Sequence, residues 1–86
     1  MKYMVELDGL HEAMALAMIR REVFKMTAEE LAEAIKQDQL WRGRDGLPPP
    51  PGRVIQRAQL FKWMFTVKGS GVSREITLQP KIRGNL

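Results

Sequence analysis

Cysteine is absent from this chain of 86 residues, and histidine occurs only once, at His11. Without thiols the chain cannot form disulfides or thiolate zinc sites. A single histidine does not make a histidine-based metal site by itself. Aromatic residues make up 7% of the chain, so few of them are available to stack on unpaired bases, and single-stranded nucleic acid is a weaker partner than a duplex. Because the chain has no thiol and only one histidine, we expect no metal, and we expect no cofactor.

Long apolar runs are also missing, and no segment approaches the length needed to span a membrane. The first residues mix charged and apolar side chains, which is not the pattern of a secretory signal. These absences predict a cytoplasmic protein with no membrane partner.

Catalytic motifs are lacking as well. The glycine pair around Ser70 is not followed by the Lys-Ser/Thr of a phosphate-binding loop. Glu29, Glu30 and Glu33 fit helix capping and a solvated helix face, with no neighbouring base, and His11 is expected to be an exposed residue of the first helix. We predict no enzymatic activity and find no small-molecule substrate indicated.

The length supports one domain, and 44% hydrophobic residues can fill one small core. We predict a single domain over residues 1–86, with the core at about 9–79 and residues 80–86 forming a loose basic tail.

The charge is divided unevenly along this domain. Residues 1–40 hold five Lys/Arg and eight Asp/Glu, whereas residues 41–86 hold nine and two. Positive potential is therefore concentrated in the second half, which favours a polyanionic partner there.

The first half predicts two helices. Asp8 is a candidate N-cap, and apolar residues recur at helical spacing from Leu10 to Arg21. A short extended link over 23–26 follows. Thr27 and Glu30 then have the spacing of a capping box, and Met26 and Leu31 occupy the hydrophobic-staple positions around it. This second helix should end near residues 37–39.

The second half predicts a turn, a third helix and a hairpin. Trp41 is expected to pack on the core, Asp45-Gly46 marks a turn, and the prolines at 48–51 form a stiff connector. The third helix should begin at Pro51 or Gly52 and continue to about Phe61. Its Val54, Ala58 and Phe61 face inward, Gln56 and Gln59 face outward, and Arg53 and Arg57 lie at the flanks. Alternating apolar residues at 65–68 and 76–79, with Gly69-Ser70-Gly71 between them, predict a β-hairpin.

This order predicts an α+β fold, a three-helix winged helix-turn-helix with a C-terminal β-hairpin as the wing. The segment Met26–Ile35, followed by Leu40-Trp41, Asp45-Gly46, the prolines, the helix around Val54–Phe61 and Phe65, resembles the HARE helix-turn-helix family. Members of that family are winged-helix modules found with restriction endonucleases, in chromatin proteins and in the delta subunit of bacterial RNA polymerase. The resemblance covers about residues 9–79. The proline run is longer than the family pattern, and the wing carries only Lys68 and Arg74.

The resemblance implies a DNA-binding role, with the third helix as the recognition helix and the hairpin as the wing. Arginine can donate twice to guanine and glutamine can pair twice with adenine, so the residue types suit base contact. The candidate DNA-binding residues are Arg53, Gln56, Arg57, Gln59, Lys62, Arg42, Arg44, Lys68 and Arg74. The alternative interpretation is that these side chains only form solvated faces and turns.

We therefore expect a non-catalytic module that binds double-stranded DNA, as a transcription or restriction-related regulator. The alternative is an adaptor that docks on a larger nucleic-acid enzyme through the apolar first helix or through Trp63. Core packing is the favoured interpretation of Trp63 itself.

Overall fold

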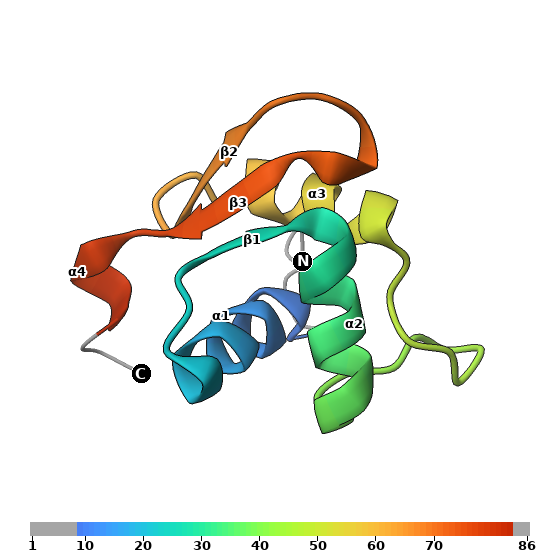
Figure 1. Ribbon diagram of the computed structural model, residues 1–86. Helices are drawn as coiled ribbons and strands as arrows, with labels where there is room; N and C mark the ends of the chain where they lie inside the picture. Colours follow the sequence, from blue (N-terminus) through green and yellow to red (C-terminus); the bar gives the residue numbers. More distant parts are fainter. Residues whose placement is uncertain (1–8, 84–86) are drawn as a thin grey trace, which may run out of the picture.

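The computed structural model describes residues 9–83, which form a small α+β fold (Figure 1). The three main helices enclose a core with a three-stranded antiparallel sheet of order β1-β3-β2. In chain order the elements are α1 (Leu10–Arg21), β1 (Lys25–Thr27), α2 (Ala28–Asp38), α3 (Pro51–Leu60), β2 (Phe65–Lys68), a 3-10 turn η2 (Gly71–Ser73), β3 (Glu75–Leu78) and α4 (Pro80–Arg83).

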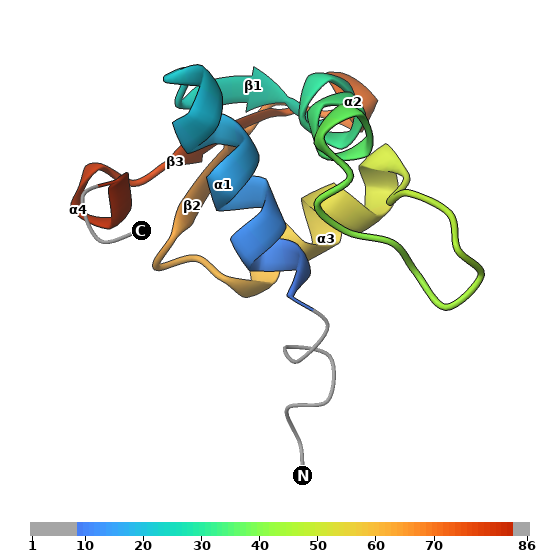
Figure 2. The same cartoon turned by 90° about the horizontal axis from the view of Figure 1, so that it is seen from below.

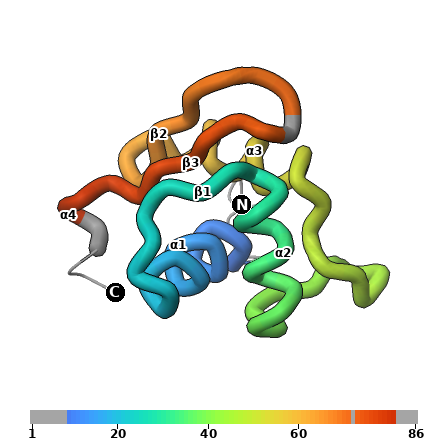
Figure 3. The backbone as a smooth tube through the Cα atoms, viewed as in Figure 1, coloured from blue at the N-terminus to red at the C-terminus, as the bar shows by residue number. Residues whose placement is uncertain are grey.

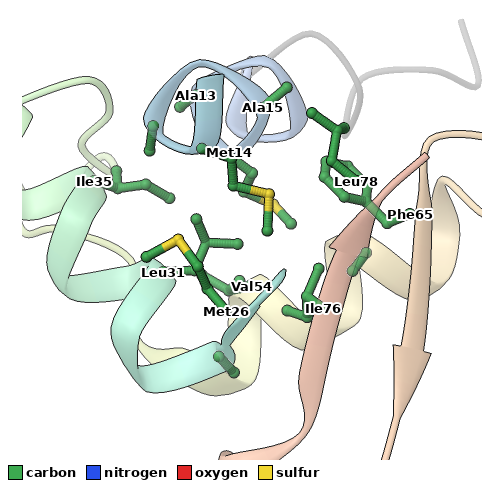
Figure 4. Packing of buried hydrophobic residues seen from close by; sticks show 14 of the residues in the cluster. Ala13, Met14, Ala15, Met26, Leu31, Ile35, Val54, Phe65, Ile76 and Leu78 are labelled. Atoms are coloured by element: carbon green, nitrogen blue, oxygen red, sulfur yellow. The ribbon is translucent and has the colours of Figure 1, made fainter. Parts of the chain in front are cut away.

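The core lies where the three helices meet the inner face of the sheet (Figure 4). Met14 of α1, Leu31 and Ile35 of α2, and Ile76 and Leu78 of β3 all have 0% exposure. Each helix supplies one apolar stripe, and none of them could bury that stripe alone. The position of α3 is therefore fixed by its packing on α1, α2 and the sheet.

Helix α1 has the predicted bounds, Leu10–Arg21, but its N-cap residue differs from the predicted one. Gly9 occupies the N-cap position with a left-handed φ of 75°, and the proposed cap Asp8 lies outside the described residues. Arg21 in the last turn contacts Asp38 at the end of α2, at 2.6 and 3.1 Å. The guanidinium lowers the pKa of that carboxyl, chiefly through its hydrogen bond. This ion pair links the C-terminal ends of the two helices.

Helix α2 begins with the predicted capping box, which is confirmed. The Glu30 amide donates to Thr27 Oγ1 at 3.1 Å, and the Thr27 amide donates to Glu30 Oε1 at 2.9 Å. Both staple residues, Met26 and Leu31, are buried. The two capping-box hydrogen bonds thus satisfy two backbone amides at the helix start without any tertiary partner.

Thr27→Ala should lower the free energy of unfolding by about 1 kcal/mol, because the Glu30 amide loses its acceptor. Chemical denaturation monitored by circular dichroism measures the change. Thr27→Ser keeps the hydroxyl and should recover most of the loss. Equal losses for the two variants would show that the methyl group of Thr27, and not the cap, is what matters.

The hairpin is confirmed, and a third strand joins it. Strand β3 pairs with β2 in the register Phe65↔Leu78 and with β1 in the register Met26↔Ile76. The segment expected to be only an extended link therefore contains an edge strand of the sheet. The burial of Met26 beside Ile76 explains the pairing, because this register places both side chains on the core face.

The C-terminal segment differs from the prediction. Residues 80–83 form the one-turn helix α4 where a loose tail was expected, and residues 84–86 lie outside the described part. Pro80 suits the first position of a helix, because the amide N–H that proline lacks would have no partner within the helix there.

Candidate nucleic-acid interface

Helix α3 presents a polar stripe to solvent. It begins with Pro51 at its first position and contains no acidic residue. Its inward stripe of Val54, Ala58 and Phe61 is buried as predicted, and Arg53, Gln56 and Gln59 are exposed. Since these three exposed side chains are spaced by three residues, they follow one side of the helix. They can form bidentate hydrogen bonds with an external partner.

The structure corrects the predicted exposure of Arg57. It was expected on an accessible flank of this helix, but only 4% of its surface is exposed. Residues 54, 57, 58 and 61 follow the i, i+3, i+4, i+7 pattern, so position 57 falls on the buried stripe. The aliphatic part of the side chain can lie along apolar neighbours. Arg57 is therefore a poor candidate for an external contact.

The first turn of α1 helps to orient α3. The rings of His11 and Phe61 are stacked, with centroids 4.1 Å apart and planes 9° from parallel. His11, expected to be exposed, is half-buried in this contact, and its Nδ1 is buried with no hydrogen-bond partner among the described residues. The stack holds the end of α3 against α1 and leaves the opposite side of α3 uncovered.

Trp41 connects α3 to the segment before it. The indole packs against the core cluster, as predicted, and the Arg53 guanidinium carbon lies 5.4 Å from the centre of its ring. A cation over an indole face is attracted by the ring quadrupole. This contact orients Arg53 at the N-terminal end of the polar stripe.

The loop between α2 and α3 projects away from the body of the domain (Figures 2 and 3). The Gly43 amide donates to the Leu47 carbonyl and the Gly46 amide to the Gly43 carbonyl, both at 2.9 Å. The Leu47 amide donates to Asp45 Oδ1 at 3.0 Å. Arg42 and Arg44 are exposed on this closed turn. The loop therefore holds two cations just before α3.

The hairpin is less positive than the loop. Lys68 is exposed, but it lies directly opposite Glu75 in the sheet. Arg74 is partly buried, and its Nε is buried with no hydrogen-bond partner found in residues 9–83. Opposite charges across a strand pair reduce each other's field at a distance. The wing contacts suggested by the sequence thus rest mainly on Lys68.

A shallow groove of about 410 Å³ separates the end of α3 from β2. The exposed Lys62 and Gln59 line it together with Ala58, Phe65, Thr66 and Val67. Lys62 therefore stands between the polar stripe of α3 and the hairpin.

Two large apolar side chains are exposed near the end of α3. Leu60 and Trp63 each have 57% of their surface accessible, so the expectation of core packing for Trp63 is wrong. The sequence contained a signal for Leu60, because it follows Gln56 by four residues and falls on the polar side of the helix. An exposed pair of this size suits contact with another macromolecule.

The solvent face of α2 has the opposite charge. Glu29, Glu30 and Glu33 line a shallow hollow of about 370 Å³ with Arg21, Met26, Ala34 and Gln37. A polyanion is repelled from this face and attracted to the side that presents Arg42, Arg44 and Arg53. The charge division of the sequence is thus also a division between elements of the fold.

Within residues 9–83, no three potential metal-ligating side chains come together. None of the helices formed by these residues has the length and apolar character required to cross a bilayer. Comparison with protein-family models, with curated proteins and with solved structures found no match.

Proposed function

We propose that this chain is a HARE-type winged-helix module that binds double-stranded DNA without catalysis, as a transcription or restriction-related regulator. The observation that carries the proposal is the exposed stripe of Arg53, Gln56 and Gln59 on a helix whose other side is packed on the core. In a helix-turn-helix protein such a helix enters the major groove, where arginine and glutamine contact base edges.

The arrangement of elements supports the same proposal. The order α1-β1-α2-α3-β2-β3 and the sheet order β1-β3-β2 are compatible with the winged helix that we propose. The helix–turn–helix pair is α2 and α3, and the hairpin β2–β3 is the wing. Exposed Arg42, Arg44, Lys62 and Lys68 around α3 supply phosphate contacts.

The double variant Arg53→Ala/Gln56→Ala should weaken binding to a 20-base-pair duplex at low salt by about tenfold or more, since each bidentate base contact contributes on the order of 1–3 kcal/mol. Fluorescence anisotropy with a labelled duplex measures the change. Arg20→Ala is the matched control, because it removes an exposed cation from α1 and should change affinity by less than about threefold.

Two results would contradict the proposal. The first is the absence of duplex binding by the unaltered protein at low salt. The second is an equal loss for Arg20→Ala and the α3 variant, which would indicate attraction by net charge without a defined interface. Circular dichroism spectra of both variants establish that the fold is retained.

A second candidate function is an adaptor that docks on a larger nucleic-acid enzyme. The observation that favours it is the exposure of two large apolar side chains, Leu60 and Trp63, at the end of α3 and just after it. Aromatic residues with an apolar neighbour are typical centres of protein interfaces. Leu60→Ala/Trp63→Ala should then abolish binding to that enzyme while leaving duplex affinity intact. Loss of duplex binding in this variant would assign the pair to the DNA interface instead.

A further inference from the structure

We propose that the loop Arg42–Leu47 enters the minor groove next to the major groove occupied by α3, and that Arg42 and Arg44 favour A·T-rich sequence there. This inference rests on the proposed function and assigns a specificity element to the same interface. It shifts the flanking contact from the hairpin after α3 to the loop before it.

The first argument is the distribution of cations on the two sides of α3. On the hairpin side the exposed cations are the lysines Lys62 and Lys68, of which Lys68 lies opposite Glu75, and Arg74 is partly buried. On the loop side Arg42 and Arg44 are both exposed, with one glycine between them. A flanking groove contact made by exposed guanidinium groups therefore has its donors on the loop.

The second argument is the shape of the loop. Two backbone hydrogen bonds close it between Gly43 and Leu47, so it is a narrow projection with a defined form. Trp41 fixes its base, through packing on the core and through the contact with Arg53 at the start of α3. Figure 2 shows the loop extending past the first turn of α3. A rigid projection beside a recognition helix can cross the phosphate backbone to the next groove without a large ordering cost.

The third argument is the chemistry of the exposed side chains. Guanidinium is more weakly hydrated than ammonium, so arginine loses less on entering a narrow groove. The narrow minor groove of A-tracts has enhanced negative potential that attracts such side chains. Leu47 is 60% exposed on the same loop and offers apolar contact with the groove walls. The Asp45 carboxylate opposes a polyanion, but its Oδ1 accepts the Leu47 amide within the turn.

The test compares two 20-base-pair duplexes that differ only in a central six-base-pair block, one an A-tract and the other G·C. The unaltered protein should prefer the A-tract duplex by about tenfold, the scale of one good groove contact. Arg42→Lys/Arg44→Lys keeps both charges, and it should retain affinity for the G·C duplex while its preference falls below about twofold. Arg42→Ala/Arg44→Ala should lose affinity for both duplexes. Netropsin, which occupies A·T minor grooves, should compete with the unaltered protein on the A-tract duplex.

The results separate this inference from the proposed function. Equal binding of both duplexes by the unaltered protein, with Arg53→Ala/Gln56→Ala still weakening binding, would overturn the loop assignment alone. An A-tract preference retained by the double lysine variant would also overturn it, because charge would then suffice. No duplex binding at low salt would overturn both proposals. Since Arg42 and Arg44 are exposed, all variants should fold, and thermal melts check this.

Discussion

Raising monovalent salt from about 50 to 200 mM should weaken duplex binding by about 250-fold. Each phosphate contact by Lys or Arg releases counterions and contributes about −0.9 to the slope of log K against log salt. The exposed cations around α3 are Arg42, Arg44, Arg53, Lys62 and Lys68. If about four or five of them reach DNA, the slope is about −4, which over a fourfold change in salt gives this loss. Anisotropy titrations at four salt concentrations measure the slope.

Single charge removals test which cations contribute to that slope. Lys62→Ala, between α3 and the hairpin, should make the slope less steep by about 1. Lys25→Ala is the control, because it removes an exposed cation from β1, the edge strand farthest from β2 in the sheet. A slope near zero accompanied by tight binding would contradict a phosphate-dominated interface and point to the apolar pair Leu60 and Trp63.

Leu31→Ala should lower the free energy of unfolding by about 3 kcal/mol, within the 2–5 kcal/mol typical of such truncations. Leu31 is fully buried where α2 meets the core, so its truncation removes apolar contacts and leaves a cavity (Figure 4). Small domains are stable by only about 5–15 kcal/mol, so this loss is a large fraction of the total. For a chain of this size the melting temperature should fall by about 15 °C.

Thermal and urea denaturation followed by circular dichroism measure both quantities. Lys36→Ala on the exposed face of the same helix is the control, and it should change stability by less than about 0.5 kcal/mol. A loss below about 1 kcal/mol for Leu31→Ala would contradict the packing of α2 against the core. The variant should also lose duplex binding at temperatures where it unfolds, since α3 keeps its position only in the folded domain.

Local signals predicted much of the fold. The capping box at Thr27 depends on four consecutive residues. Pro51 starts α3 because proline has no backbone N–H, and the N–H at the first helical position has no partner within the helix. The alternation around Phe65 and Ile76 predicted the hairpin for the same kind of local reason. The edge strand β1 was not predicted as a strand, because three residues carry too little periodicity and their pairing partner Ile76 is fifty positions away.

The candidate interface was predicted in part. The exposure of Arg53, Gln56 and Gln59 follows from helical spacing and agrees with the structure. The prediction for Arg57 is wrong because a charged side chain is usually exposed, whereas position 57 lies on the buried stripe of the helix. Trp63 was misplaced because an indole just after a helix can turn toward or away from the core, and only the packing of that turn decides between them.

By itself, the sequence determined the approximate boundaries of the three main helices, the hairpin and the concentration of positive charge in the second half, because caps, prolines, alternation and composition act over a few neighbouring residues. Only the tertiary structure decided which of those charges face solvent, since burial depends on what packs above each side chain. It buried Arg57, opposed Lys68 with Glu75 and placed Arg53 over Trp41. The loop that presents Arg42 and Arg44 is a local feature by contrast, because hydrogen bonds within residues 43–47 close it around the predicted Asp45-Gly46 turn.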